Sequence, residues 1–417
     1  MKYKFKKKYI VVFLLVFITL TIYISCSQKG LISEKFSGED YKVPKLIPNR
    51  SLQENPTFIT YGDVRPGYRI MEKFLKKENW YTWKMLIFPF YEFYLLGNGI
   101  IGRIDLTRND SGFGYKERIM VRDAVYNEAK DSEVDFILNT GDFVIDGRYP
   151  NHWMRFINEN KIEVALLNEI PYLPTIGSHE WANDSTFGLK NYNAIFEYPR
   201  FYVIEYPDID IFVIDSNIIL DQEKLIDDDT QDKLFNKWIV SKGESEQPAW
   251  LEEKLANSDK TFKVISMHHP PISFGTHHSD WMRTDCGNNL IEKRKLLLKM
   301  FQKYGVQIIF CSHEHLYERN ILRYETNDNN GYDEIQIIIS GGGGVPLREK
   351  SSPDKIQEYL DYYNNEGLDV IQVKQKEMYH YCLVDVDANQ VRVDVIEVRK
   401  DTEKPTRLEE TFVIKKD

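Results

Sequence analysis

The fold is decided by GVQIIFCSHEH, the stretch at residues 305–315. Its first part, Gly305–Cys311, is an apolar run of the length and composition that are typical of a buried parallel strand. Two histidines, His313 and His315, follow this run directly. Residues i and i+2 of an extended chain point to the same side, so both imidazoles can face one site. The stretch therefore predicts a buried strand whose carboxyl end presents two imidazoles to a common ligand.

Four earlier segments repeat this arrangement, each with an Asp or a His directly after a strand-like run. In an open α/β sheet, ligands gather at the carboxyl ends of the strands, so five such ends can converge on one site. A site of Asp and His, without a Ser or Cys nucleophile, indicates hard or borderline metal ions, and the sequence therefore predicts a metal centre. In chain order the segments are Gly62-Asp63-Val64-Arg65 after Pro56–Tyr61, Gly141-Asp142 after Val134–Asn139, Gly177-Ser178-His179-Glu180 after Ile170–Ile176, and His268-His269-Pro270-Pro271 after Phe262–Met267.

The order and spacing of the five segments resemble those of the calcineurin-like metallophosphoesterases, including the purple acid phosphatase branch. That family carries D-x-H, G-D-x-x-D/Y, G-N-H-D/E, H-x-P and G-H-x-H in this order. The resemblance implies a four-layer α/β/β/α sandwich with mixed sheets, formed by residues 57–417 with insertions near 78–112, 219–247 and 350–376. It also implies two divalent or trivalent metal ions (Fe, Mn or Zn). The implied reaction is hydrolysis of phosphate mono- or diesters by in-line attack of a metal-bound hydroxide.

The resemblance extends to individual residues. Asp142 is expected to bridge the two ions, because one carboxylate can give an oxygen to each. Arg65 stands at the D-x-H histidine and is expected to clamp a phosphate oxygen, since a guanidinium stays protonated and cannot bind a cation. His179 is expected to contact the phosphate or to protonate the leaving oxygen. The expected catalytic residues are thus His179, Arg65 and Asp142, and the expected metal ligands are Asp63, Asp142, Ser178, His268, His313 and His315. By the resemblance, Asp63 and His315 bind the first ion and His313 binds the second.

Other positions also depart from the family's motifs. Ile145 stands where the family has Asp or Tyr, and Ser178 stands where it has a metal-binding asparagine. The first ion thereby loses its usual extra ligand and is expected to bind weakly. His277 and His278 could supply a missing imidazole, or they could be an exposed loop pair. The departures favour an alternative function, a non-catalytic or weakly catalytic surface lipoprotein that uses the same fold for binding, whereas the retained carboxylates and histidines oppose it.

The start of the chain is typical of a secretory signal, with five lysines followed by an apolar stretch at Tyr9–Ile24. Ile24-Ser25-Cys26-Ser27 resembles the cleavage box of bacterial lipoproteins, in which the cysteine is acylated, and an uncleaved membrane anchor is the alternative. Residues 1–25 are thus the expected signal peptide and residues 26–56 a polar tether. The mature protein is expected to be exported and anchored in a membrane through lipidated Cys26, at the periplasmic face or the cell surface.

The charge balance excludes one class of partner. Removal of residues 1–25 deletes five lysines and no acids, so the formal net charge moves from −10 to −15. Such a protein repels nucleic acid backbones, and no nucleic acid binding is expected. The three cysteines that remain besides Cys26 are too few, and odd in number, for a disulfide framework.

Composition and apolar periodicity predict the remaining elements. The aromatic part of 78–112 is expected to be an extra helix or hairpin, with a lid over the site or a membrane-resting surface as the alternative. Residues 351–367 are polar and are expected to be a surface excursion. Helices are expected at Arg69–Lys77, Tyr115–Ala129 and Leu290–Tyr304, and antiparallel strands at Tyr379–Val386, Gln390–Val398 and Glu410–Lys415.

Overall fold

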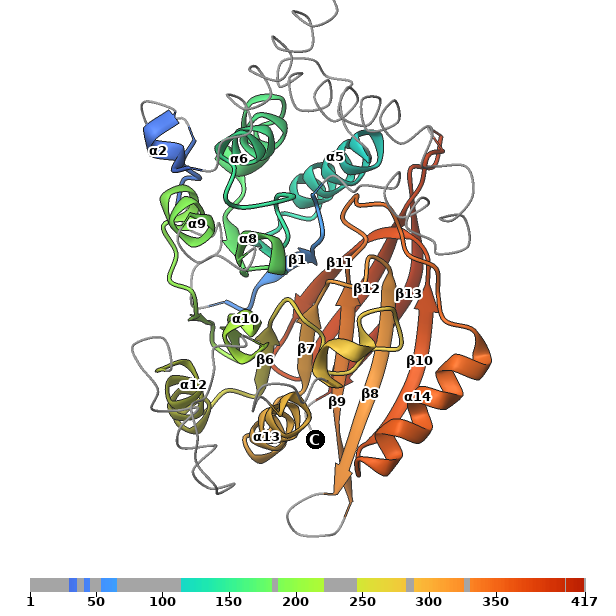
Figure 1. Ribbon diagram of the computed structural model, residues 1–417. Coiled ribbons are helices and arrows are strands. Elements are labelled where there is room, and N and C mark those ends of the chain that lie inside the picture. Colours follow the sequence, from blue (N-terminus) through green and yellow to red (C-terminus); the bar gives the residue numbers. More distant parts are fainter. Residues whose placement is uncertain are drawn as a thin grey trace, which may run out of the picture.

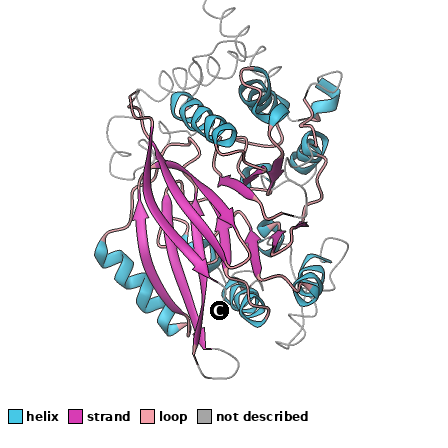
Figure 2. Ribbon diagram, turned by 180° about the vertical axis from the view of Figure 1, so that it is seen from behind, coloured by secondary structure: helices cyan, strands magenta, loops and turns pink. Residues whose placement is uncertain are grey.

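A computed structural model describes residues 30–35, 41–45, 54–65, 114–181, 187–220, 246–282, 289–325, 331–401 and 403–415. Two mixed β-sheets pack face to face, and helices cover their outer faces (Figures 1 and 2). The predicted four-layer α/β/β/α sandwich is thus confirmed. The predicted signal peptide with Cys26, the helix at 69–77 and the insertion at 78–112 lie outside the described residues, as does most of the insertion at 219–247. Among the described helices, none has both the length and the apolar composition that are needed to cross a membrane.

The first sheet has the strand order β13-β12-β11-β1-β2-β3. Its strands β1 (Thr57–Tyr61), β2 (Phe136–Asn139) and β3 (Tyr172–Pro174) are parallel, and each lies within a run that the sequence analysis predicted. The antiparallel half consists of β11 (Tyr379–Val386), β12 (Gln390–Val398) and β13 (Thr406–Lys415). The first two match their predicted bounds, whereas β13 begins four residues before the predicted start at Glu410.

The second sheet has the order β10-β8-β9-β7-β6-β5-β4. Strands β5, β6, β7 and β9 are parallel, and the carboxyl ends of β6 and β7 lead into the last two motif segments. The bounds are β4 Tyr202–Glu205, β5 Ile209–Val213, β6 Phe262–Ser266, β7 Ile308–Cys311, β8 Tyr317–Glu325, β9 Tyr332–Ser340 and β10 Asp369–Lys376.

Three apolar cores hold the layers together. Between the sheets, side chains from both inner faces interdigitate, and the rings of Phe58 and Phe136 stack with their centroids 4.9 Å apart. The core outside the first sheet lies under α5 (Tyr115–Asp131), α6 (Pro150–Ile157) and α9 (Gly188–Phe196). The core outside the second sheet lies under α12 (Glu246–Asn257), α13 (Leu290–Lys303) and α14 (Pro353–Asn365). Shorter helical segments are α2 Ile32–Lys35, a π-helix Asn158–Ile162, α7 Leu166–Glu169, α8 Ser178–Trp181, α10 Ser216–Leu220 and a 3-10 helix His278–Met282.

The stretch predicted as a polar tether packs on the domain wherever it is described. Ile32, Tyr41 and Val43 are buried in the core under α6 and α9. The backbone N–H of Val43 donates to the carbonyl of Ile195 at 2.8 Å. The prediction of a polar tether over 26–56 therefore does not hold for these residues, because isolated apolar side chains among polar ones are enough to dock a segment.

Residues 351–367, predicted as a surface excursion, contain the helix α14, which packs on the domain through one face. The Ser352 side chain caps α14 by accepting the backbone N–H of Lys355. Ile356, Leu360 and Tyr363 recur at helical spacing and pack on the core of the second sheet. This spacing is visible in the sequence, but the many polar residues around it hid the apolar face.

Candidate metal centre

The five motif segments meet at the carboxyl ends of β1, β2, β3, β6 and β7. Three contacts join segments that are far apart in the chain. Arg65 contacts Asp142, His268 contacts Asp142, and His315 contacts Asp63. The ends of strands from both sheets therefore converge on one buried site, as the sequence analysis expected.

The backbone is left-handed at four residues of these strand ends. φ is 58° at Asp63, 62° at Asp142, 76° at His313 and 50° at His315. A side chain other than glycine in this region costs on the order of 1–2 kcal/mol, so the conformation persists only where the surrounding structure holds it. Only two other non-glycine residues of the described ranges share it. Backbone strain is therefore concentrated at the residues predicted to bind metal, which is typical of a functional site.

Asp142 is fully buried, and its two carboxylate oxygens face different sides of the site. Oδ1 lies 3.3 Å from His268 Nε2 and accepts the backbone N–H of His179 at 2.9 Å. Oδ2 accepts a hydrogen bond from Arg65 Nε at 3.0 Å. Gly141, with a φ of 102°, permits the turn that brings the carboxylate here. Asp142 thus lies in the middle of the site, where a bridging ligand was predicted.

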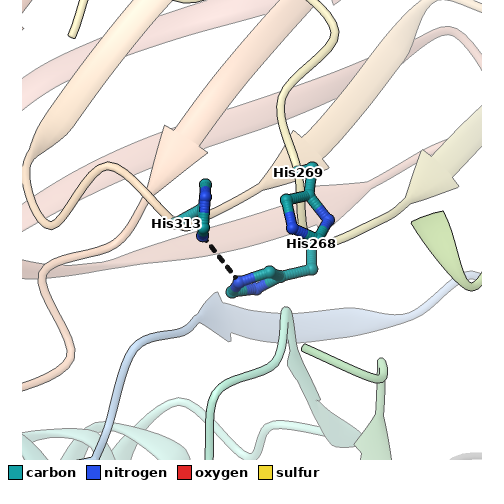
Figure 3. A group of neighbouring side chains, drawn as sticks. All are labelled: His268, His269 and His313. Atoms are coloured by element: carbon teal, nitrogen blue, oxygen red, sulfur yellow. Dashed lines mark hydrogen bonds between the residues drawn. The ribbon is translucent and has the colours of Figure 1, made fainter. Parts of the chain in front are cut away.

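His268 and His313 present unprotonated ring nitrogens to each other. His268 Nδ1 lies 2.9 Å from the carbonyl oxygen of Thr140, which can only accept, so Nδ1 carries the proton. His313 Nε2 lies 2.9 Å from a carboxylate oxygen of Asp280, so Nε2 carries the proton of that ring. The two remaining nitrogens, His268 Nε2 and His313 Nδ1, are 3.1 Å apart, the contact dashed in Figure 3. Neither nitrogen can donate to the other, and a cation between them would satisfy both.

The spacing of the donor atoms fits such a cation. An ion about 2.0–2.2 Å from each of two donors, at octahedral to tetrahedral angles, holds them roughly 3–3.5 Å apart. His268 Nε2 is 3.1 Å from His313 Nδ1 and 3.3 Å from Asp142 Oδ1. The Ser178 hydroxyl lies 3.3 Å from the same Asp142 oxygen. Carbonyl and carboxylate partners on the far ring nitrogens are the usual means of orienting metal-binding imidazoles. These residues therefore fit the second of the two expected ions.

His269 adds a third imidazole that the sequence analysis did not count among the ligands. Its ring centroid lies 4.5 Å from that of His313, and Figure 3 shows the three rings as one group. Donor atoms of His268, His269 and His313 all lie within 4.8 Å of one another. His269 Nδ1 is 2.8 Å from the Ser216 hydroxyl, which fixes the ring.

Arg65 lies among the residues that were expected to bind the first ion. Its Nε binds Asp142 Oδ2 at 3.0 Å, and its Nη2 lies 3.1 Å from His315 Nε2. Asp63 Oδ2 accepts the backbone N–H of His313 at 2.6 Å, whereas the buried Oδ1 has no hydrogen-bond partner. Asp63, Asp142 and His315 therefore surround a guanidinium, and they do not fit a first ion while Arg65 lies between them.

Burial has the largest single effect on the pKa values of the carboxyl groups and imidazoles of the site. Burial and then the charge of Asp142 raise the pKa of Asp63 well above its usual value. Burial also acts to raise the pKa of Asp142, but its electrostatic interactions with His268, His179 and Arg65 hold that pKa well below its usual value. Burial lowers the pKa of His268 and holds that of His313 well below the usual range. The imidazoles are therefore neutral at neutral pH, the form that binds metal.

His179 directs Nε2 into the site and is partly exposed. Its Nδ1 donates to the carbonyl oxygen of Ile145, so Nε2 carries the lone pair. Nε2 lies 3.8 Å from Asp142 Oδ2. Burial, followed by the charge of Arg65, lowers the pKa of His179 to about 4. Without substrate the ring is thus an acceptor at neutral pH, and the predicted proton donation to a leaving oxygen requires a bound phosphate to raise this pKa.

Glu180 holds the turn that carries Asp142, a role that the sequence analysis missed. Its Oε2 accepts the backbone N–H groups of Gly177 and Asp142, both at 2.9 Å. Its Oε1 accepts those of Phe143 at 2.9 Å and Val144 at 3.2 Å. Burial and the charge of Asp142 raise the pKa of Glu180 to about 8, and the backbone donors act in the opposite direction. Its place directly after His179 in a motif segment was the available signal.

Glu314 and Asp280 position the loop that follows the fourth motif. Glu314 is buried and accepts the Ser273 hydroxyl at 2.6 Å and the backbone N–H of His277 at 2.8 Å. Asp280 Oδ2 contacts His277 Nδ1 at 3.1 Å as well as His313. The loop thereby places a carboxylate behind a predicted ligand. The position of Glu314 between His313 and His315 gave a signal for its role, whereas Asp280 lies in no motif.

His277 and His278, in the loop after the fourth motif segment, have different surroundings. The His277 ring lies against that of His313, with centroids 3.8 Å apart. His278 is buried, contacts the carbonyl of Ser273 at 2.8 Å through Nδ1, and stacks on Tyr359. The alternative of an exposed pair is therefore wrong for His278, because its ring packs against α14.

The chain is similar to several known phosphatases. Residues 110–317 match the family Calcineurin-like phosphoesterase. Probable inactive purple acid phosphatase 27 of Arabidopsis thaliana is 23% identical over 243 residues, which cover 55% of this chain and 38% of that protein. Purple acid phosphatase 15 of the same plant is 24% identical over 134 residues, which cover 30% of this chain and 23% of that protein. The chain thus spans less than two fifths of the length of these curated relatives.

A solved purple acid phosphatase from yellow lupin (Lupinus luteus) seeds has the same fold. The TM-score is 0.53 at 14% identity, and the match covers 89% of this chain and 55% of that chain. The family match over residues 110–317 includes four of the five motif segments. Together with the strand ends that converge on Asp142, these findings support a calcineurin-like phosphoesterase domain at residues 110–317.

Proposed function

We propose that this protein is a metal-dependent hydrolase of phosphate esters. The observation that supports the proposal most directly is the pair of unprotonated nitrogens on His268 and His313, 3.1 Å apart beside the buried Asp142. A bound metal ion neutralises the charge of phosphate oxygens and lowers the pKa of water, which is the chemistry that ester hydrolysis needs. The calcineurin-like family and the purple acid phosphatase relatives point to the same reaction.

Each residue of the site has a distinct part in this proposal. Asp142, His268 and His313 would hold the ion, with the Ser178 hydroxyl as a neutral and weaker ligand. Nitrogen and carboxylate donors suit Fe, Mn or Zn. His179, with its acceptor nitrogen facing Asp142, would bind a proton of the substrate or of the attacking water.

The proposal is tested by ester hydrolysis with defined metals. The full chain is purified in detergent, stripped with a chelator, and assayed on p-nitrophenyl phosphate and its bis ester with Mn, Fe, Zn or Ca added. We expect no hydrolysis by the stripped protein and recovery of hydrolysis with at least one metal. Stoichiometric metal binding without cleavage of either ester would contradict the proposal.

A binding protein on the same fold is the second candidate. Two contacts favour a binding protein, because Arg65 forms hydrogen bonds with both Asp142 and His315. Two relatives carry names that include the words "Probable inactive". This candidate predicts that the metal-loaded protein binds inorganic phosphate, measured by calorimetry, while both esters remain intact.

We further propose that the protein is exported and anchored through Cys26, because the sequence around it resembles a lipoprotein cleavage box. Cys26→Ala should abolish incorporation of radiolabelled palmitate and leave an unprocessed or released protein. Cys286→Ala is the control and should be labelled like the wild type. Labelling that persists in Cys26→Ala would exclude the anchor at this cysteine.

A further inference from the structure

Asp142 divides its carboxylate between two cationic positions. Oδ1 faces the metal-binding nitrogen of His268 at 3.3 Å, and Oδ2 binds Arg65 Nε at 3.0 Å. A carboxylate that bridges two ions would likewise give one oxygen to each. In this protein the Arg65 guanidinium therefore occupies the position next to Asp142 Oδ2 that the first ion would take.

Arg65 also uses the imidazole that the first ion would need. Its Nη2 lies 3.1 Å from His315 Nε2, which must accept this hydrogen bond because a guanidinium has only donors. The lone pair of His315 is thus engaged by the arginine. The backbone N–H of Arg65 donates to the carbonyl of Asp142 at 3.2 Å, and the residue is only 8% exposed. The guanidinium is therefore held in place on both sides and is part of the buried site.

The charge of Arg65 also opposes an ion at the first position. Asp142 is fully buried, and Arg65 is the nearly buried cation that contacts it. A second divalent ion at Asp142 Oδ2 and His315 Nε2 would lie directly against the permanent charge of the arginine.

We infer that the Arg65 guanidinium replaces the first metal ion, so that the site binds one divalent ion, at Asp142, His268 and His313. This inference rests on the proposed metal-dependent function and changes the expected number of ions from two to one. It also gives Arg65 a role different from the expected phosphate clamp, since Nε and Nη2 are both engaged by protein groups.

The test counts metal ions and does not depend on activity. Wild-type protein and Arg65→His are loaded with Mn²⁺, freed of excess ion, and measured by elemental analysis and by electron paramagnetic resonance. Arg65→His removes the guanidinium and restores an imidazole beside Asp63, whose buried Oδ1 has no hydrogen-bond partner in the present site. We expect about one ion per chain in the wild type and about two in Arg65→His, with the exchange-coupled signal of a manganese pair in the variant alone.

Arg148→His is the matched control. Arg148 pairs with Asp146 at 2.6 Å, close to the site but outside it, so this variant adds a histidine without freeing the first-ion position. It should bind about one ion, like the wild type. Circular dichroism and thermal melting establish that each variant is folded.

The outcomes separate this inference from the proposed function. Two ions in the wild type, or one ion in a folded Arg65→His, would overturn the inference and leave metal-dependent hydrolysis standing. No bound ion in either protein would overturn both. If Arg65→His does not fold, anomalous diffraction from Mn²⁺-soaked wild-type crystals decides. One peak between His268 and His313 is expected, and a second peak next to Asp63 and His315 would refute the inference.

Discussion

Asp142→Asn should lose at least about 1,000-fold in kcat/KM for phosphate esters. Metal catalysis contributes several kcal/mol, and each 1.36 kcal/mol is tenfold in rate. The substitution removes the charge that faces both His268 and Arg65 while it nearly keeps the shape of the side chain. Metal affinity should fall by more than about 100-fold, the upper end of what second-shell changes cost. Steady-state kinetics and metal titration measure the two effects.

The control for this variant is Asp146→Asn, in the same loop. The Asp146 side chain binds the backbone and side chain of Arg148 and does not hydrogen-bond to any described residue of the metal site. It should keep both turnover and metal affinity near the wild-type level. A folded Asp142→Asn protein with unchanged turnover would place the reaction at another site or exclude it.

Glu180→Gln should destabilise the fold and loosen the metal site together. The carboxylate accepts four backbone N–H groups, and the amide of glutamine would face two of them with donors of its own. Buried donors without acceptors cost about 1–3 kcal/mol each, so we expect a loss of about 2–6 kcal/mol in the free energy of unfolding. The turn that carries Asp142 should shift, and metal affinity should fall by about 10–100-fold. Urea unfolding and metal titration measure these changes.

The variant Glu159→Gln separates the loss of stability from the loss of metal affinity. Glu159 is another buried carboxylate, which binds Arg118 at 2.6 Å and Arg155 at 3.0 Å, away from the metal site. Its loss should also destabilise the protein, because it leaves buried guanidinium donors without their partner. Metal affinity should stay at the wild-type level. Wild-type metal affinity in Glu180→Gln would show that Glu180 supports the fold without positioning Asp142.

Much of the fold and the gathering of the site could be predicted because both depend on local patterns. Apolar runs mark the strands, and residues at the carboxyl ends of parallel strands must converge. Asp142, His268 and His313 come together for this reason. The packing of Ile32 and Val43 was missed, because single apolar residues in a polar stretch give no periodic signal.

The contacts of the site's polar side chains could not be predicted from spacing. Arg65 was expected to meet a phosphate, but the direction of a long side chain depends on which buried partners the tertiary structure brings within reach. Glu180 acts through backbone N–H groups, which exist at every position, so its place after His179 marks the residue but not its partners. Asp280 lies outside every motif and reaches His313 only because the loop folds back.

We propose that a metal ion at Asp142, His268 and His313 supports phosphate ester hydrolysis. The most direct measurement is turnover as a function of bound metal, with the stripped full-length protein titrated in steps and both quantities measured on each sample. Turnover should rise in proportion to bound metal and reach its maximum at about one ion per chain. Turnover that does not change with metal occupancy, or that begins only after the first ion is bound, would contradict this proposal.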